Sequence, residues 1–526
     1  MKEKIQDSKQ TSGGEKEITR KKKANRNVKK GKSSRYRVLE DYWISNPLAR
    51  VKIISSGEQI QYIVKETKLG PKEKEAHEKL VSLLTKELVP PETMDFDVSS
   101  YILSEAKRLA VKYKRSLGKF DEKSWKKIFY YVVRDLAGYG DLDVLIRDPY
   151  IEDISCNGVG IPVYVWHRKY ESIPSNIKFT DEIQLNNFIV KLAHMSNRHI
   201  SSAHPMLDAM LSEKHRLAAT FMREVSTFGS SFCIRKFRTD PFSIVDLIKI
   251  GTLDEKMAAY LWILLENKMS LMIIGGTGAG KTSMLNALIS LIEPNDKMVT
   301  VEEIAELSAF HENWVQLVSR EGFRFGAAKE SSISLFDLVK LSLRYRPDYI
   351  VVGEVRGEEA YALFQAVATG HGGMCTMHAD SLDHAVKRLT SPPMNVAEIY
   401  IPLMNVGIYI SRVDLPQMKM GLKFGRRVRK IWEIIEYGKY KIISDWSPSD
   451  DSFRSNFENS FLLDRIASKL GKGKEKLLQE IRRREEFLKN LVKSGKRSQK
   501  DVGEAVMKYY GSRSDIYDGK EEATDL

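Results

Sequence analysis

The most constraining feature of this sequence is the stretch from Leu271 to Ser283, LMIIGGTGAGKTS. Four apolar residues, typical of a buried strand, lead into the pattern Gly-x-x-x-x-Gly-Lys-Thr, which is the signature of a phosphate-binding loop. Glycines allow the backbone to turn tightly, so that successive N–H groups point at phosphate oxygens. A helix from about Thr282 adds its positive N-terminal end at the same place. The stretch therefore predicts a nucleotide site rather than a chance glycine-rich turn.

Two side chains of this loop have roles that follow from the chemistry of phosphates. Lys281 is expected to place its ammonium on the β- and γ-phosphates, and Thr282 to place its hydroxyl on Mg²⁺. ATP and Mg²⁺ are the ligands that this pattern implies. The loop residues predicted to bind the nucleotide are Gly275, Gly276, Thr277, Gly278, Ala279, Gly280, Lys281, Thr282 and Ser283.

Length and composition bound the architecture. A chain of 526 residues is too long for one core, so two to four folded units are expected. Its hydrophobic fraction of 42% and charged fraction of 29% are typical of soluble globular proteins. No apolar run approaches the ~20 residues that cross a membrane, and the charged N-terminus lacks the apolar segment of a signal peptide. A cytosolic protein is therefore expected.

The three cysteines, Cys156, Cys233 and Cys375, lie far apart in the chain. This spacing matches neither a zinc module nor a disulfide framework, and it favours buried thiols in a reducing compartment.

Residues 1–36 carry an excess of positive charge. They hold 13 Lys or Arg against 4 Asp or Glu, while the whole chain has a net charge of +14. Their low apolar content predicts a disordered basic tail. Such a tail can contact anionic lipid or nucleic acid, or it can simply be solvated, and a charge run alone does not decide between these roles.

Three folded units are predicted before and through the phosphate loop. Residues 37–96 suggest a small unit of one β-hairpin and one helix, since strand-like segments flank Ser55 to Gln59 and Pro71 opens a charged helix. Residues 97–238 suggest an α+β domain with a mixed or antiparallel sheet. After a linker at 239–244, strands alternate with helices over 242–440, which indicates a parallel sheet with crossover helices. A helical appendage is expected over 455–512.

Carboxylates follow two of the predicted strands in the nucleotide-binding unit. Glu354 comes directly after the apolar strand Tyr349 to Val352, where open α/β sheets bind ligands, so it is expected to bind Mg²⁺ or polarise water. Glu302, Glu303 and Glu306 follow the strand at Thr300. They suit a general base or a metal ligand, but an acidic surface turn accounts for them nearly as well.

Two further groups near the loop leave alternatives open. His371 and His378 are a poor metal pair at a spacing of seven, although a histidine at a strand end can sense the γ-phosphate by a hydrogen bond. Arginine forks suit phosphate oxygens, but most of those here must form structural ion pairs, since one nucleotide cannot use five. These arginines are Arg320, Arg324, Arg344, Arg346 and Arg356.

Four segments together make a family recognisable. GGTGAGKT, TVEEIAEL, RYRPDYIVVGEVRGEEA and ATGHGGMCTMHA occur in that order at natural separations. This resembles the type II/type IV secretion ATPase superfamily, also called traffic ATPases. Within it the chain looks most like the archaeal type IV pilus and archaellum assembly branch, because of the PPMN segment and the helical C-terminal appendage.

The resemblance implies a fold class of α/β, with a RecA-like P-loop ATPase domain preceded by a PAS-like α+β domain, and a ring of six subunits with ATP at the domain junction. Lys281 and Thr282 would carry the Walker A roles. Glu302 would activate water, with Glu303 beside it at the metal. Glu354 would be the Walker B carboxylate.

The resemblance also implies residues that spacing alone does not indicate. His378 is the expected phosphate sensor of the His371 to His378 segment. Arg216 and Arg235, from the N-terminal domain, match arginines that reach the bound phosphates in relatives, and such clamps would let phosphate loss release one domain from the other. The expected catalytic residues are Lys281, Glu302, Glu354 and His378, and the expected metal ligands are Thr282, Glu303 and Glu354.

The function expected from these features is an ATP-hydrolysing hexameric motor at the cytoplasmic face of the membrane. It would push on a polytopic platform protein that assembles pilus-like filaments. The alternatives are an archaellum or DNA/protein-export ATPase of the same superfamily, and, in another class, a nucleic-acid-stimulated translocase or helicase. Nucleic acid is not expected among the partners. A scaffold without turnover is disfavoured by the intact Lys281, Glu302 and Glu354.

Overall fold

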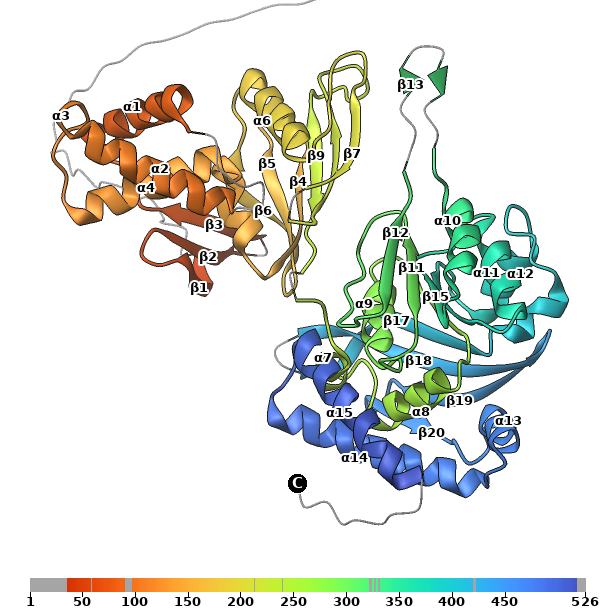
Figure 1. The fold of residues 1–526 in the computed structure, drawn as a ribbon. Helices are drawn as coiled ribbons and strands as arrows, with labels where there is room; N and C mark the ends of the chain where they lie inside the picture. Colours follow the sequence, from red (N-terminus) through yellow and green to blue (C-terminus); the bar gives the residue numbers. More distant parts are fainter. Residues whose placement is uncertain are drawn as a thin grey trace, which may run out of the picture.

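The structure is a computed structural model, and two large sheets organise it (Figure 1). One sheet belongs to the N-terminal part of the chain and the other to the part that contains the phosphate loop. The predicted basic tail, residues 1–36, lies outside the described residues except for its last residue. The described residues are 36–57, 59–89, 97–211, 213–238, 240–320, 324–325, 328–329, 332–419 and 422–517.

The N-terminal sheet has nine strands in the order β1-β2-β3-β6-β5-β4-β9-β8-β7. Its neighbouring strands are antiparallel except where β3 meets β6 in parallel. The strands are β1 (Arg37–Ser45), β2 (Ala49–Ser56), β3 (Gln59–Glu66), β4 (Ile151–Cys156), β5 (Pro162–His167), β6 (Glu171–Lys178), β7 (Met206–Met210), β8 (Arg216–Thr220) and β9 (Ser231–Arg235).

Helices pack beside this sheet, and their ends follow capping rules. Asp97, Asp121 and Asp181 each accept N–H groups from the first turn of the helix that follows, which satisfies donors that a helix leaves free. The helices are α1 (Pro71–Glu87), α2 (Val98–Lys112), α3 (Lys114–Leu117), α4 (Glu122–Leu136), α5 (Asp143–Arg147) and α6 (Glu182–Met195), with a 3-10 turn, η1 (Gly140–Leu142).

The hairpin unit of residues 37–96 is not separate from the domain that follows. Strand β3 joins β6 at the pair Tyr62 and Ser175, and the Tyr62 hydroxyl donates to buried Asp148 at 2.5 Å. Helix α1 packs with α2 and α4 in one apolar cluster. The sheet therefore runs across the boundary expected near residue 96, because tertiary pairing between distant strands leaves no local sequence signal.

The second sheet has nine strands in the order β12-β11-β15-β16-β10-β17-β18-β19-β20. The strands from β12 to β17 are parallel neighbours. Strand β17 also begins an antiparallel meander that continues through β18, β19 and β20. The strands are β10 (Leu271–Ile274), β11 (Met298–Glu302), β12 (Trp314–Val318), β15 (Tyr349–Val352), β16 (Gly372–Met377), β17 (Val406–Lys419), β18 (Leu422–Glu436), β19 (Lys439–Ser447) and β20 (Ser452–Ser455), and β13 (Arg324–Phe325) pairs separately with β14 (Ala328–Lys329).

Helices cover both faces of the parallel strands, and this explains why those strands are apolar throughout. Leu271 and Ile273 of β10 face one cluster, whereas Met272 and Ile274 face the other. The first cluster includes α7 (Ile244–Lys249), α8 (Glu255–Glu266) and α9 (Lys281–Ile289); the second includes α10 (Leu335–Ser342), α11 (Glu359–Ala368) and α12 (Leu382–Thr390), with the 3-10 segments η2 (Leu343–Tyr345) and η3 (Glu398–Leu403) nearby.

Three C-terminal helices pack on the same face of the sheet as α7, α8 and α9. They are α13 (Phe461–Leu470), α14 (Lys474–Ser494) and α15 (Gln499–Tyr517), and α14 packs along α8. Leu477, Ile481 and Leu488 of α14 belong to the same core as β10. The helices are thus part of the nucleotide-binding domain, whose sheet continues past residue 440 to Ser455.

The predicted fold class is confirmed: an α/β phosphate-loop domain follows an α+β domain. The order β12-β11-β15-β16-β10 places the loop strand inside the parallel sheet, as a RecA-like domain requires. Within the described residues, none of the helices has the length and apolar character needed to cross a membrane.

Candidate functional site

The phosphate loop, residues 275–282, connects β10 to α9 at the carboxyl edge of the sheet. Close packing requires glycine at its start, since a Cβ on Gly275 would lie 2.3 Å from the carbonyl oxygen of Ile410. Gly278 and Gly280 have φ angles of +68° and +96°, which side chains other than glycine rarely adopt. The N-terminal end of α9 then faces the space that the loop encloses.

Lys281 is buried inside this loop. Its ammonium donates to the carbonyl oxygen of Gly276 at 3.0 Å and lies 3.3 Å from the ring nitrogens of His378. Burial lowers the pKa of Lys281, the positive charge of Arg356 lowers it further, and Glu354 opposes both. Because Lys281 is buried and has few anionic partners, its ammonium is well suited to bind phosphate oxygens.

A chain of polar contacts runs from Lys281 to the end of β11. Glu354 Oε1 lies 3.1 Å from Nε2 of His378, and its Oε2 accepts from Nη2 of Arg356 at 2.6 Å. Nη1 of Arg356 is 3.2 Å from Oε2 of Glu303. The structure thus brings together four predicted residues, Lys281, His378, Glu354 and Glu303, and identifies Arg356 as the arginine that links them.

His378 is held neutral in this network. Burial lowers its pKa first, Lys281 lowers it further, and Glu354 partly restores it. Arg388 of α12 fixes the backbone here, since its guanidinium donates to the carbonyl oxygen of His378. A neutral imidazole beside the lysine can donate one hydrogen bond to a phosphate oxygen.

His371 occupies the opposite end of the same strand. It precedes β16 and its ring contacts Thr369 and the carbonyl oxygen of Ala366. The six residues of β16 separate it from His378, a span of about 20 Å at 3.3 Å per residue. Of the two histidines, only His378 therefore lies at the loop.

Glu302, expected to activate water, has both carboxylate oxygens hydrogen-bonded within its own domain. It is the last residue of β11 and is 3% exposed. Its Oε1 accepts the N–H groups of Glu306 and Leu307, both at 2.9 Å, and its Oε2 accepts from Gln316 at 2.8 Å. Burial raises its pKa. A carboxylate with both oxygens engaged in this way holds the turn that follows it, and it leaves little room for an attacking water.

Glu306, one of the three glutamates expected to act as general base or metal ligand, lies nearest to Thr282 in its electrostatic contacts. The Thr282 side chain lies near enough to its carboxyl group to lower the pKa. Burial raises the pKa of Glu306, while Arg235 and then Arg216 lower it. The tight turn held by Glu302 aims Glu306 back at the loop, and that turn was not predictable from the run Glu302, Glu303, Glu306.

Arg216 and Arg235 are opposite neighbours on β8 and β9 of the N-terminal domain. Each is paired within its own domain: Arg216 with Asp208 at 2.7 Å, and Arg235 with Asp153 at 3.2 Å. Both also lie within electrostatic range of Glu306 across the domain junction. That the two arginines reach bound phosphates stays a prediction.

The donors near Thr282 are the hard oxygens that Mg²⁺ prefers. In the described part of the chain, no group of three or more His, Cys, Asp or Glu side chains is arranged to hold a metal on its own. Mg²⁺ bound with a nucleotide takes only one or two protein oxygens, with phosphates and waters as its other ligands. Thr282 and Glu306 fit that requirement, while Glu303 and Glu354 are both ion-paired with Arg356; the metal roles expected of Thr282, Glu303 and Glu354 stay a prediction.

A cavity of about 590 Å³ opens beside the loop. Gly276, Thr277 and His378 line one wall, and His384, Lys387 and Arg388 of α12 line another. A volume of this size suits a small ligand, and its basic wall favours an anionic one.

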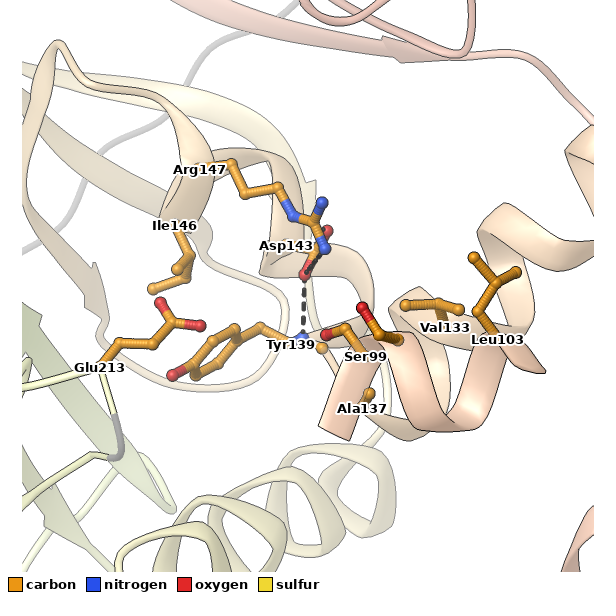
Figure 2. Close-up of a pocket in the computed structure, with 11 residues that line it drawn as sticks. Ser99, Leu103, Val133, Ala137, Tyr139, Asp143, Ile146, Arg147 and Glu213 are labelled. Atoms are coloured by element: carbon orange, nitrogen blue, oxygen red, sulfur yellow. Dashed lines mark hydrogen bonds and ion pairs between the residues drawn. The ribbon is translucent and has the colours of Figure 1, made fainter. Parts of the chain in front are cut away.

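A second cavity, of about 400 Å³, lies within the N-terminal domain, away from the loop (Figure 2). Tyr139, Asp143 and Glu213 line it, together with Arg147 and the start of α2. Burial raises the pKa of both carboxyl groups. None of the residues that line this cavity belongs to the phosphate loop, so the two cavities are separate sites.

Comparison with known families gives one match of large extent. The family described as "Type II/IV secretion system protein" matches residues 142–408. These residues run from the N-terminal domain through the loop to β17.

Individual relatives agree with that match. An uncharacterised protein of Methanocaldococcus jannaschii is 37% identical over 350 residues, which cover 65% of this chain and 62% of the relative. The match thus spans less than two thirds of that relative's length. A putative conjugal transfer protein of Mycobacterium tuberculosis is 33% identical over 255 residues, covering 47% of this chain and 70% of the relative.

Among solved structures, the ATPase DotB of Legionella pneumophila is similar at 16% identity. The similarity covers 71% of this chain and 89% of that one, with a TM-score of 0.41. A score this low supports no argument, and the fold is taken from the strand order itself.

Proposed function

This chain belongs to the type II/IV secretion system protein family, and from that premise we propose that it is an ATPase in which hydrolysis moves the N-terminal domain against the nucleotide-binding domain. Six copies would form a ring that pushes on a polytopic membrane platform protein and drives the assembly of pilus-like filaments.

One observation carries this proposal. Thr282 of the phosphate loop, and Arg235 and Arg216 of the other domain, lie near enough to Glu306 to lower the pKa of its carboxyl group. A γ-phosphate bound near Thr282 would compete with Glu306 for the two arginines, because phosphate and carboxylate both suit a guanidinium fork. Gain and loss of that phosphate would then change the force between the domains.

The residues divide the work as follows. Lys281 and the loop N–H groups would hold the phosphates. The single N–H of neutral His378 faces Glu354 in this structure, and on nucleotide binding it would exchange that carboxylate for a γ-phosphate oxygen. Mg²⁺, when bound, would neutralise phosphate charge, with Thr282 and a nearby carboxylate as its protein ligands. Glu306 would orient and deprotonate the attacking water, in place of the hydrogen-bonded Glu302.

The proposed site of action is the cytoplasmic face of the membrane. The basic tail, residues 1–36, would strengthen attachment there by attraction to anionic lipid. Deletion of the tail should leave ATP turnover unchanged and reduce co-sedimentation with anionic vesicles in a salt-dependent way. Equal sedimentation with and without the tail would mean that the tail does not contribute to membrane attachment.

The site assignment is tested by Lys281→Ala in the full-length protein. Turnover of ATP should fall at least 100-fold, because the ammonium on the β- and γ-phosphates is lost. Lys340→Ala, at a lysine on α10 that stacks on Phe336, is the matched control and should keep normal turnover. Normal turnover in the Lys281 variant would contradict the assignment.

The assembly is tested by light scattering of the purified protein with and without ATP. A mass of six subunits is the expected result, and a monomer under all nucleotide conditions would contradict the ring.

A second candidate function is export of DNA or protein, and the conjugal transfer relative is the observation in its favour. ATP turnover separates the candidates. Stimulation by membranes that contain the platform protein supports filament assembly, whereas salt-sensitive stimulation by DNA supports a nucleic-acid translocase.

A further inference from the structure

Two arginines of the β17–β18 hairpin reach across to the N-terminal domain. Arg412 of β17 and Arg426 of β18 are directly opposite each other in the sheet. Arg412 is ion-paired with Glu171 at the start of β6, and Arg426 Nη2 lies 3.8 Å from Oε2 of Glu152 on β4. The hairpin therefore makes two parallel links between the domains.

Arg426 alone of this pair also contacts the phosphate loop. Its Nε donates to the carbonyl oxygen of Gly278 at 3.0 Å. Its Cδ would be 3.1 Å from a Cβ on Gly280, so the side chain lies close against the loop backbone. Among the described contacts of Arg412, which include Glu171 and the ring of Phe424, none involves the loop.

Glu152 connects this contact to the strands that carry Arg235. The carbonyl oxygen of Glu152 accepts the N–H of Lys236 at 2.8 Å. The next residue, Asp153, is the direct partner of Arg235 in the sheet and binds its guanidinium at 3.2 Å. Movement of Glu152 is thus movement of the segment that presents Arg235 to the loop.

We propose that Arg426 is a positioning residue that couples the phosphate loop to the N-terminal domain through Gly278 and Glu152. This Gly278–Arg426–Glu152 bridge deepens the proposed function, on which it rests, because it gives the loop a direct mechanical connection to Arg235. It keeps the loop in the shape that accepts phosphates, and it transmits a shift of the loop to β4 and β9.

The charges around Glu152 make the bridge sensitive to that one carboxylate. Arg168 also points at Glu152, with its Nε 3.5 Å from Oε1. Burial lowers the pKa of Arg168, and the nearby charges of Arg238 and Arg426 lower it further. Removing the Glu152 charge would leave these guanidinium groups to repel one another and would free Arg426 from its place.

The bridge is tested by nucleotide affinity in the full-length protein, with a fluorescent ADP analogue as the probe. Arg426→Gln should raise Kd at least fivefold, the lower end of typical coupling between sites. Glu152→Gln should have a similar effect. The double variant should be no weaker than the stronger single variant, since both changes break the same connection.

Arg412→Gln is the matched control. It removes the opposite arginine and the parallel interdomain link, yet Kd should change less than twofold. An equal loss of affinity in the Arg412 and Arg426 variants, or additive losses in the Arg426 and Glu152 double variant, would overturn the bridge.

A second readout separates this inference from the proposed function. In nucleotide-free protein, amide hydrogen exchange of a peptide spanning residues 275–282 should be faster in Arg426→Gln and Glu152→Gln than in wild type or Arg412→Gln. Unchanged exchange in both variants would overturn the bridge even if the enzyme hydrolyses ATP. Failure of the wild type to bind nucleotide would overturn the proposed function instead, while the exchange measurement still decides the bridge.

Arg426→Lys covers the case in which the glutamine variant fails to fold. Lysine keeps the charge facing Glu152 but lacks the Nε–H that reaches Gly278, so an intermediate rise in Kd is expected. Wild-type affinity and wild-type exchange in this variant would contradict a role for the Gly278 contact.

Discussion

At the residue scale, hydrogen bonding separates carboxylates that look alike in the sequence. Glu302, Glu303 and Glu306 lie within five positions. Glu302 is buried under three hydrogen bonds, Glu303 is ion-paired with Arg356, and Glu306 lies near Thr282. Of the three, Glu306 is the one whose pKa responds to Thr282 of the loop, and this is why we propose it as the base.

The glutamates can be distinguished by charge-neutral variants. Glu306→Gln should lower kcat at least 100-fold while ATP still binds, because the amide cannot accept the proton of the attacking water. Glu303→Gln, the matched control, should cost less than tenfold. Single-turnover hydrolysis with a separate binding assay provides the measurement. Equal losses of kcat in the two variants would contradict the assignment of Glu306 as the general base.

Glu302→Gln should act mainly on stability. An amide nitrogen in place of Oε1 or Oε2 would face N–H donors, and an unsatisfied buried group costs about 1–3 kcal/mol. Chemical denaturation measures this loss. Full stability combined with loss of turnover would support the original expectation that Glu302 activates water.

A buried histidine next to Arg216 predicts how stability depends on pH. His215 is 4% exposed, and its Nδ1 accepts the N–H of Phe237 at 3.2 Å. Burial, assisted by the charge of Lys236, lowers its pKa to about 4. The folded protein therefore binds this proton less readily than the unfolded chain, whose histidine has a pKa near 6.5.

The stability that neutral His215 contributes is present above pH 6.5 and is lost as the pH falls toward 4. Between pH 7 and pH 5 the loss amounts to about 2 kcal/mol. His215→Asn keeps a hydrogen-bond acceptor but does not titrate. Between pH 7 and pH 5 the unfolding free energy of this variant should therefore fall by about 2 kcal/mol less than that of the wild type. Urea unfolding at the two pH values measures it, with the exposed His384→Asn as control. The same pH slope in wild type and the His215 variant would refute the assignment.

At the scale of elements, the C-terminal helices are built into the nucleotide-binding core. Arg484 of α14 is fully buried, where it is ion-paired with Glu266 of α8 and with Glu480 at 3.1 Å. Its guanidinium carbon lies 4.6 Å from the centre of the Trp262 ring. Helix α8 immediately precedes β10, so this contact supports the strand that leads into the loop.

Arg484→Ala should destabilise the nucleotide-binding domain by about 3–5 kcal/mol, because it removes a buried guanidinium that is ion-paired with both Glu266 and Glu480. Denaturant unfolding followed by tryptophan fluorescence measures the change. The neighbouring Arg483→Ala is the control; that side chain is 57% exposed and should cost under about 1 kcal/mol. A small effect at Arg484 would mean that α14 is only loosely attached.

At the scale of the whole molecule, the proposed site draws residues from both domains. Arg216 and Arg235 come from one sheet and Lys281, Glu306 and Glu354 from the edge of the other. The predicted superfamily is confirmed, and relatives from a methanogenic archaeon fit the archaeal branch. Hydrolysis in such a junction is expected to depend on the distance between the domains.

Arg216→Gln and Arg235→Gln should each lower ATP turnover at least tenfold, with little change in the affinity for ADP, because the arginines act on the γ-phosphate across the junction. Arg223→Gln is the control, since Arg223 is exposed and pairs with Glu182 within its own domain. Turnover and ADP binding in the full-length protein are measured together. Normal turnover in both arginine variants would place them outside the site.

Local patterns predicted much of the fold. The hairpin at residues 49–66, the helices near 71–88, 122–136 and 182–196, and the loop strand all lie close to their expected positions. Strands β6, β7, β12 and β16 and the β17–β20 meander were not predicted, because mixed polar residues and glycine- or turn-rich segments carry little periodicity.

The sequence by itself determined the nucleotide site and its family. The spacing of glycines, lysine and threonine is a covalent property of one short segment, and a four-residue apolar strand before it needs no distant partner to be recognised. The roles that we propose for Glu302, Glu306 and Arg426 rest on tertiary contacts. Whether a carboxylate is engaged or free, and whether an arginine lies against a loop 148 residues away, depend on strand pairing and domain contact, which no local pattern encodes.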